Sequence, residues 1–144
     1  MNINKFTQKS LQAVQDCEKT AMEYGNQEIE QEHLLYALLT QDDSLILKMM
    51  EKMGLDKNLV IDRVEQAIAK RPKVQGGQPY VGQYLNKALI SAEDEMKQMG
   101  DEYVSVEHLF LALLKHPSRE MKQLFRELGI SREGFLQALS TVRG

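Results

Sequence analysis

The stretch Glu32-His33-Leu34-Leu35-Tyr36-Ala37-Leu38-Leu39 decides the fold of this 144-residue chain, because the chain contains it twice. It returns 75 positions later as Glu107-His108-Leu109-Phe110-Leu111-Ala112-Leu113-Leu114. The same shift, without a gap, pairs small residues on both sides of this stretch: Ala13 with Ala88, Gly25 with Gly100, and Gly54 with Gly129. Matches that concentrate on apolar positions and glycines indicate a duplicated structural unit.

Each copy has the pattern of four helices. Apolar and small residues recur at spacings of three and four in the first segment of each copy, as on one face of an amphipathic helix. These first helices end at glycines, which suit the left-handed position after a helix. Strand-like alternation is absent from the sequence. The further helices are expected at 31–40 and 106–115, then 44–53 and 118–128, then from Asp56 to about 70 and from Ser131 to about 142.

The segment Arg71-Pro72-Lys73-Val74-Gln75-Gly76-Gly77-Gln78-Pro79 separates the copies, and its prolines and glycines indicate a loop. Each copy alone is too small to bury its apolar faces well, so the two are expected to share one core. The predicted fold is all-α: eight helices, formed by two pseudo-symmetric four-helix repeats, packed as one domain over 1–144. Repeat 1 spans 5–70, the linker 71–79 and repeat 2 80–143.

Composition excludes several classes of protein. The chain carries 21 acidic and 18 basic side chains, a net charge of −3, which argues against a protein that coats nucleic acid or an anionic membrane. A single cysteine, Cys17, excludes an internal disulfide and a thiolate zinc cage. No apolar run approaches membrane-spanning length, and the first residues lack the apolar core of a signal peptide. A soluble domain of a reducing cytoplasm is therefore expected.

No catalytic constellation is evident. The chain has no G-x-x-x-x-G-K-[ST] string for a nucleotide phosphate. The pairs Glu32-His33 and Glu107-His108 are isolated, and adjacent helix positions point apart, so a metal site is not expected. Cys17 lies on an apolar stripe and is interpreted as a small core residue. The domain itself is therefore not expected to be an enzyme.

The repeated Glu-His pair has two interpretations. In the first, the glutamate favours the helix start through the helix dipole, and the histidine fills a half-buried position and bonds a neighbouring turn. In the second, an exposed glutamate at each pseudo-symmetric position receives a basic or modified side chain of a partner. The sequence favours the first interpretation and leaves the second open.

These residues resemble the N-terminal domain of the Clp family of AAA+ unfoldases, a doubled four-helix repeat with a Glu-His-Leu-Leu-x-Ala-Leu-Leu signature. The opening Phe6-Thr7-Gln8-Lys9 is also similar to that family. The linker from Arg71 to Gly77 and the run from Gly100 to His108 resemble the disaggregase branch, ClpB, more than the protease-feeding branch, ClpC.

The resemblance implies that the chain is one module of a larger cytoplasmic machine. The parent would be a hexameric ATPase ring that works with the DnaK chaperone system, and ATP and Mg²⁺ would bind its other modules, with no cofactor in this domain. The module would bind exposed segments of unfolded or aggregated polypeptides and no nucleic acid or membrane. The isolated domain is expected to be a monomer. A stand-alone helical scaffold without an ATPase is the alternative from another class.

The resemblance also implies a shallow substrate groove on the second repeat, near its first two helices and the N-terminal segment. Position by position, the groove residues are Thr7, Ser91, Glu95, Asp101, Glu107 and His108. Relatives often have leucine at the positions of Ser91, Glu95 and His108. The polar residues found here imply a preference for polypeptide segments that mix basic and apolar side chains.

The ClpC branch implies a different site. There, glutamates at the positions of Glu32 and Glu107 bind phosphorylated arginine, or adaptor proteins dock nearby, for a ClpC-type unfoldase that feeds a Clp protease. The flanking Glu30-Gln31 and Ser105-Val106 depart from that branch's pattern by adding charge or bulk. This is the second functional hypothesis.

Overall fold

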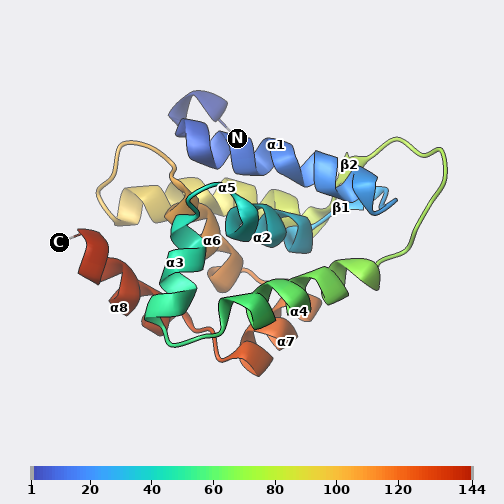
Figure 1. Ribbon diagram of the computed structural model, residues 1–144. Coiled ribbons are helices and arrows are strands. Elements are labelled where there is room, and N and C mark those ends of the chain that lie inside the picture. The colour runs from blue at the N-terminus through green and yellow to red at the C-terminus, as the bar shows by residue number, and fades with distance from the viewer. Residues whose placement is uncertain (1, 144) are drawn as a thin grey trace.

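The computed structural model describes residues 2–143, and eight α-helices dominate it (Figure 1), which confirms the all-α prediction. The expected helix bounds agree with the observed ones to within one or two residues, apart from the less sharply predicted starts of the first helices. The helices are α1 (Gln8–Glu23), α2 (Gln31–Thr40), α3 (Leu45–Lys52), α4 (Lys57–Ala69), α5 (Gln83–Gln98), α6 (Val106–Lys115), α7 (Arg119–Leu128) and α8 (Arg132–Arg143). A short 3₁₀ turn, η1 (Ile3–Lys5), precedes α1.

Side-chain caps explain where the helices begin. The hydroxyls of Ser44 and Ser118 accept hydrogen bonds from the backbone N–H groups of Leu47 and Met121, and so start α3 and α7. Such a bond satisfies one of the N–H groups that a helix start leaves free. The glycines after the first helices, Gly25 and Gly100, adopt the left-handed conformation that the sequence predicted, with φ of 72° and 71°. Gly129 does the same at the end of α7, with φ of 73°.

Two very short strands accompany the helices, although the sequence shows no strand-like alternation. Strand β1 (Glu28–Ile29) pairs in parallel with β2 (Tyr80–Val81), and an isolated parallel bridge joins Phe6 to Val104. Under the 75-residue shift, Phe6 corresponds to Val81 and Ile29 to Val104. Each repeat therefore pairs the segment before its first helix with the other repeat. Two-residue strands are too short to give an alternating pattern in the sequence.

The contacts between helices show the same reciprocal relation between the two repeats. Contacts between α1 and α6 correspond to contacts between α5 and α2, and contacts between α4 and α7 correspond to those between α8 and α3. Figure 1 shows α2 and α6 in the middle of the molecule, with α4 and α7 side by side along one edge. This approximate two-fold arrangement supports our proposed division into 5–70, 71–79 and 80–143.

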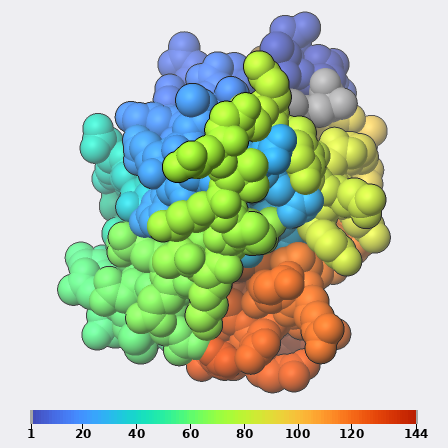
Figure 2. All heavy atoms as spheres, turned by 90° about the vertical axis from the view of Figure 1, so that its right-hand side faces the viewer, coloured from blue at the N-terminus to red at the C-terminus, as the bar shows by residue number. Residues whose placement is uncertain are grey.

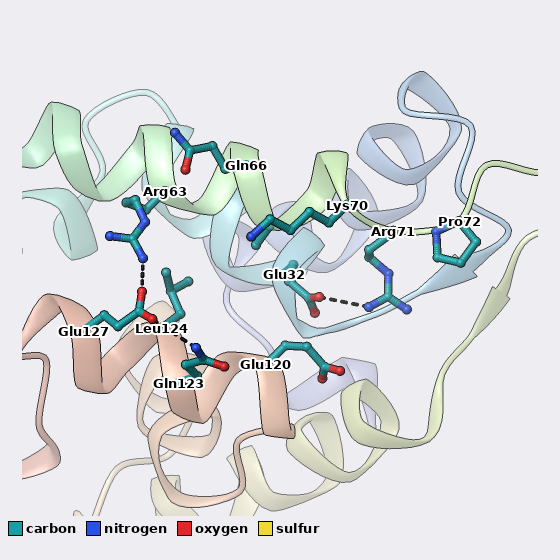
Figure 3. Close-up of a pocket in the computed structure, with 11 residues that line it drawn as sticks. Glu32, Arg63, Gln66, Lys70, Arg71, Pro72, Glu120, Gln123, Leu124 and Glu127 are labelled. Atoms are coloured by element: carbon teal, nitrogen blue, oxygen red, sulfur yellow. Dashed lines mark hydrogen bonds and ion pairs between the residues drawn. The ribbon is translucent and has the colours of Figure 1, made fainter.

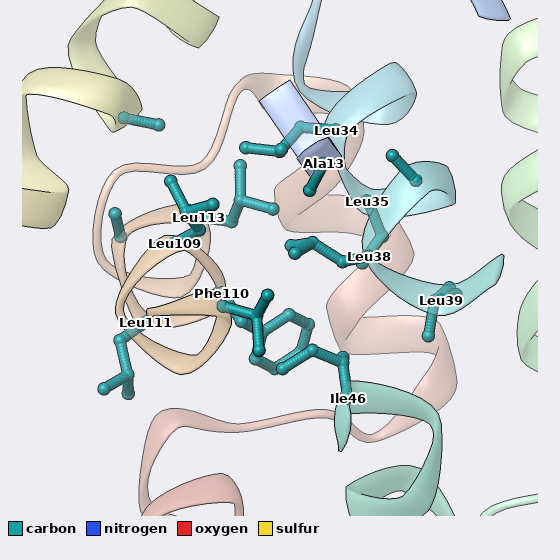
Figure 4. Packing of buried hydrophobic residues seen from close by; sticks show 14 of the residues in the cluster. Ala13, Leu34, Leu35, Leu38, Leu39, Ile46, Leu109, Phe110, Leu111 and Leu113 are labelled. Atoms are coloured by element: carbon teal, nitrogen blue, oxygen red, sulfur yellow. The ribbon is translucent and has the colours of Figure 1, made fainter. Parts of the chain in front are cut away.

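Helices α2 and α6 form the centre of the core (Figure 4). Leu34 and Leu38 of α2 and Leu109 and Phe110 of α6 are completely buried. The ring of Phe110 lies 4.6 Å from that of Phe135 in α8, measured between ring centroids. Burial of each such side chain contributes about 1.5–3 kcal/mol to folding, so this pair of helices carries much of the stability.

The linker is attached to the surface along part of its length. The N–H of Val74 donates to the carbonyl oxygen of Gly25 at 2.9 Å, and the side-chain amide of Asn26 donates to the carbonyl oxygen of Pro72 at 3.1 Å. Figure 2 shows this segment in lime green against the blue surface of the first part of the chain. The loop character that its prolines and glycines predicted is confirmed, and its first residue, Arg71, enters the site described below.

Glu30 caps two helices at once. Its carboxylate accepts hydrogen bonds from the N–H of Gln31 at the start of α2 and from those of Tyr84 and Leu85 at the start of α5, at 3.0–3.2 Å. The carboxylate approaches so closely that a Cβ at Gly82 would lie 1.9 Å from it, so only glycine fits there. Burial, the largest influence, raises the pKa of Glu30 above its ordinary value.

Gln31 connects the repeats in a second way. Its side-chain N–H₂ donates to the carbonyl oxygens of Tyr84 at 3.0 Å and His116 at 2.8 Å, and its side-chain oxygen accepts from the N–H of Ser118 at 2.8 Å. Gln31 is fully buried. Replacement by an apolar residue would therefore leave the Ser118 N–H and the His116 carbonyl oxygen without this partner and remove one bond to the Tyr84 carbonyl oxygen.

We expect Gln31→Ala to lower the free energy of unfolding by about 2–4 kcal/mol, because unsatisfied buried groups cost about 1–3 kcal/mol each and water replaces some of the lost bonds. Urea denaturation followed by circular dichroism measures this loss. The matched control is Gln66→Ala on the exposed face of α4, for which we expect a change below about 0.5 kcal/mol. Equal effects of the two substitutions would contradict the assigned role of Gln31.

Candidate functional site

A shallow apolar depression lies between the N-terminal segment and α5. It has a volume of about 360 Å³ and is lined by Asn2, Phe6, Leu89, Ile90 and Glu93. Ile90 is 54% exposed, although most apolar residues of α5 face the core. An exposed isoleucine next to the small exposed parts of the largely buried Phe6 and Leu89 provides a surface that an apolar side chain can cover.

Both repeats contribute to this depression. The bridge of Phe6 to Val104 is reinforced by hydrogen bonds from the N–H of Val104 to the carbonyl oxygen of Lys5 at 2.7 Å and from the N–H of Thr7 to that of Val104 at 3.0 Å. The hydroxyl of Ser10 also donates to the Val104 carbonyl oxygen, at 2.6 Å. These bonds hold the N-terminal segment beside α5, so the depression exists only where the two repeats meet.

Three of the six predicted groove residues lie near the depression but do not line it. Thr7 is the N-cap of α1, where its hydroxyl oxygen accepts from the N–H of Ser10 at 3.1 Å. Ser91 and Glu95 lie one turn apart on α5, and both are buried. The Glu95 carboxylate forms an ion pair with Arg132 at the start of α8. These two side chains of α5 therefore face the interior, on a different side of the helix from Ile90.

The other three predicted residues gather around Arg143. Its guanidinium contacts Asp101 at 2.6 Å and Glu107 at 3.7 Å, and Asp101 also lies 2.7 Å from Nε2 of His108. Partial burial acts to raise the pKa of Asp101, but the hydrogen bonds from Arg143 and His108 outweigh it, so this pKa is lowered. The structure thus brings Asp101, Glu107 and His108 together in one ion-paired cluster with Arg143.

Both repeated histidines are helix caps. Nδ1 of His33 accepts from the N–H of Glu30 at 2.9 Å, and Nδ1 of His108 accepts from the N–H of Ser105 at 2.8 Å. Nε2 then carries the proton and donates to Asn26 in repeat 1 and to Asp101 in repeat 2. Both side chains are completely buried, so the expectation of a half-buried position was wrong, whereas the expected bond to a neighbouring turn is confirmed.

The expectation of exposed glutamates was also wrong, because Glu32 is 2% and Glu107 8% exposed. Arg71 pairs with Glu32 at 2.9 Å (Figure 3). It also pairs with Glu28 at 2.6 Å. Arg143 approaches Glu107 in the second repeat. In both repeats, the arginine comes from the C-terminal end of the fourth helix or the residues just after it.

The pair of Glu32 and Arg71 lines a cavity of about 490 Å³ between α4 and α7. Oε1 of Glu32 and Nε of Arg71 are buried without a hydrogen-bond partner among the described residues. Burial acts to lower the pKa of Arg71, but the charge of Glu32 and its hydrogen bond outweigh that effect and raise it. The guanidinium of Arg71 therefore stays charged and remains paired with the Glu32 carboxylate.

The described residues contain no group of three or more His, Cys, Asp or Glu side chains placed to hold a metal ion. No helix within residues 2–143 combines the length and the apolar character that crossing a bilayer requires. Cys17 is buried as predicted, and burial raises the pKa of its thiol.

Sequence reasoning missed the apolar residues of the depression. Ile90 falls outside the buried stripe of α5, and this departure from the helical period was the available signal. Phe6 and Leu89 belong to the apolar stripes that the sequence predicts for the helices. They line one depression because the pairing of residue 6 with residue 104 brings the N-terminal segment next to α5. Such a pairing depends on tertiary structure.

A family model described as the Clp repeat (R) N-terminal domain matches residues 5–128. A protein named chaperone protein ClpB from Nitratidesulfovibrio vulgaris is 41% identical over 150 aligned positions, which cover 100% of this chain and 17% of that protein. The chain therefore spans about a sixth of the length of this relative.

Solved structures share the fold. The Hsp104 N-terminal domain from Candida albicans superposes with a TM-score of 0.81 at 21% identity, covering 97% of this chain and 92% of that one. A complex of a ClpV N-domain with a VipB peptide superposes with a TM-score of 0.72 at 26% identity, covering 96% and 89%.

The buried histidine caps predict a pH-dependent stability. Burial, helped by the charge of Arg71, lowers the pKa of His33 from 6.5 to about 4. The unfolded chain therefore binds this proton more tightly than the folded one, so the stabilisation is complete above about pH 6.5 and is lost as the pH falls toward 4. We expect a loss of up to about 3 kcal/mol over this range, measured by urea unfolding at a series of pH values.

His33→Gln should flatten the slope between pH 5 and 6.5, although it also lowers the overall stability. His116→Gln, at a half-buried histidine whose side chain caps no helix start, is the control and should keep the slope because it retains His33. A stability that stays constant from pH 7 to 5 in the unsubstituted chain would contradict the role given to His33.

Proposed function

The chain belongs to the Clp repeat (R) N-terminal domain family, and from that premise we propose that it is the substrate-engaging N-terminal domain of a ClpB-type protein disaggregase. In this role it binds exposed segments of misfolded or aggregated polypeptides. The relatives with 41% and 38% identity are both named chaperone protein ClpB. Family membership makes this chain a non-catalytic module of AAA+ chaperones, and client binding is the proposal.

The observation that carries the proposal is the apolar depression formed by Phe6, Leu89 and Ile90. Unfolded polypeptides expose apolar side chains that folded proteins bury, and an exposed isoleucine beside two apolar neighbours attracts them. Because the depression is shallow, it offers few deeply buried anchors, and binding in the micromolar range or weaker follows. Weak binding suits a module that samples many clients.

Charge at the depression comes from Glu93 at its rim. The sequence implied a basic preference from the polar residues at positions 91, 95 and 108. Of the carboxylates in the predicted groove, Glu95 is paired with Arg132, and Asp101 and Glu107 contact Arg143, so they are not free to attract a client. Glu93 has only a long contact of 3.9 Å with Lys97. The proposed preference for mixed basic and apolar segments therefore rests on Glu93.

The remaining parts of the parent machine extend the proposal. A hexameric ATPase ring that binds ATP and Mg²⁺, cooperation with the DnaK chaperone system and a cytoplasmic location are inferred from the ClpB relatives, of which the chain covers 17%. A ClpV N-domain has been solved with a VipB peptide, which supports peptide binding as a use of this fold.

We expect Ile90→Ser to weaken binding of a reduced, unfolded polypeptide by about three- to tenfold, because it removes most of the exposed apolar surface of the depression. Titration of the ¹⁵N-labelled domain by NMR measures the affinity and locates the contacts. Shifts should concentrate on residues 2–7 and 89–93. Their absence at client concentrations that saturate a ClpB ring would overturn the proposal.

Leu59→Ser is the matched control. Leu59 is 50% exposed on α4, away from the depression, so its replacement removes a similar apolar area without touching the site. Its affinity should equal that of the unsubstituted chain. A comparable loss in both variants would mean that clients bind exposed apolar residues anywhere on the surface.

The ClpC-type alternative gains one observation, the buried Oε1 of Glu32 without a hydrogen-bond partner. Against it, Arg71 and Arg143 already contact Glu32 and Glu107. An incoming phosphoarginine or adaptor side chain would have to displace a partly buried ion pair, which is costly.

We therefore expect calorimetry to give the same weak affinity for a phosphoarginine peptide as for its unmodified arginine counterpart. Tight binding of the phosphoarginine peptide that disappears in a Glu32→Ala, Glu107→Ala variant would establish the alternative instead. The double replacement Arg71→Ala, Arg143→Ala frees both glutamates and tests whether the arginines are what prevents binding.

A further inference from the structure

A second cavity, of about 600 Å³, lies on repeat 2 and is strongly basic. It is bordered by the start of α5, the end of α6, one face of α7 and the start of α8. We call it the basic cleft and define it by its five cationic side chains, Lys87, Lys115, Lys122, Arg126 and Arg132. No carboxylate lines it, although the chain as a whole carries a net charge of −3.

Most of this charge is uncompensated. Lys87, Lys115, Lys122 and Arg126 are exposed, and none of them forms an ion pair within residues 2–143. Arg132 is the exception, because Glu95 neutralises it. Four cations around one hollow create a local positive potential that attracts anionic groups and speeds their association.

The floor of the basic cleft is apolar. Leu114, Phe125 and Ile130 line it beneath the charged rim. Ser131, just before α8, also lies on its border, so the positive end of that twelve-residue helix adds to the potential. A cavity with an apolar floor and a cationic rim selects ligands that combine negative charge with an apolar side chain.

We propose that the basic cleft binds an acidic segment of a partner polypeptide, whose carboxylates lie on the lysines and Arg126 and whose apolar side chain lies on Phe125 and Ile130. This site goes beyond the proposed function, since it shares no residue with the apolar depression. It takes a different class of ligand, because the cations here are free while Glu93 marks the rim of the depression.

A polypeptide fits these observations better than a nucleic acid. The cations surround one compact hollow, whereas nucleic-acid sites follow the phosphate backbone as an extended basic stripe. The remaining surface carries the excess of acidic side chains that makes the whole chain negative, and it would repel a long polyanion. Carboxylates beside an apolar residue are, in contrast, a common combination in acidic polypeptide segments.

The test uses a fluorescein-labelled peptide rich in glutamate with two leucines, and a second peptide in which lysine replaces every glutamate. Fluorescence anisotropy should show binding of the acidic peptide only, and the affinity should fall about tenfold or more between roughly 0.05 and 0.3 M salt, since exposed charges are screened. Binding of both peptides, or no binding of the acidic one, would overturn the proposal.

Lys122→Glu combined with Arg126→Glu should weaken acidic-peptide binding at least tenfold. The control, Lys19→Glu combined with Lys73→Glu, changes the net charge equally at exposed positions of repeat 1 and the linker and should retain at least half of the affinity. Equal losses in the two variants would show that only the overall charge matters, and complete displacement of the peptide by a short DNA duplex would assign the cleft to nucleic acid.

Ile90→Ser distinguishes this site from the apolar depression. The acidic peptide should bind this variant with unchanged affinity even where the unfolded client binds less tightly. If Ile90→Ser weakens the acidic peptide as much as the client, the basic cleft is not a separate site. If the client fails to bind the unsubstituted chain while the acidic peptide binds it, the basic cleft stands and the proposed function falls.

Discussion

Helices α2 and α6 are buried on nearly every side. Neither repeat alone has enough helices to cover its own central helix. These helices pack against each other, and each also contacts the first helix of the other repeat: α2 contacts α5, and α6 contacts α1. These contacts completely bury Leu34, Leu38, Leu109 and Phe110. Burial of these two helices therefore requires both copies in one core. The double cap by Glu30 and the linkage by Gln31 fix the relative position of the copies.

Local chemistry and periodicity predicted most of the fold. The ends of α2 and α6 follow from the spacing of leucines, and those of α3 and α7 from the apolar positions and the glycines after the helices. The parallel pairing of residues 28–29 with 80–81 could not be predicted in this way, because two residues carry no pattern and their partners lie 52 positions apart in the chain. Such contacts arise from the packing of the repeats.

The site was less predictable for a related reason. A sequence gives residue types, whereas availability for a partner depends on what each side chain contacts after folding. Glu32, Glu95 and Glu107 have the residue type of a site for cations, yet arginines distant in the chain occupy them. The carboxylates nearest the helix starts are thus structural, and the two surfaces proposed for binding are made from Ile90 and from lysines that form no ion pair within residues 2–143.

The departures of repeat 2 from repeat 1 identify where a partner can bind. Under the 75-residue shift, the core leucines and the cap histidines recur, so duplication preserved the parts that burial requires. Ile90, by contrast, corresponds to Gln15, Lys122 to Leu47 and Arg126 to Glu51. Repeat 1 therefore has the same core but lacks both surfaces. The packing of the fold does not require an exposed isoleucine between residues 6 and 89 or a cluster of unpaired cations at these positions. Their presence in repeat 2 therefore supports the two proposed binding sites.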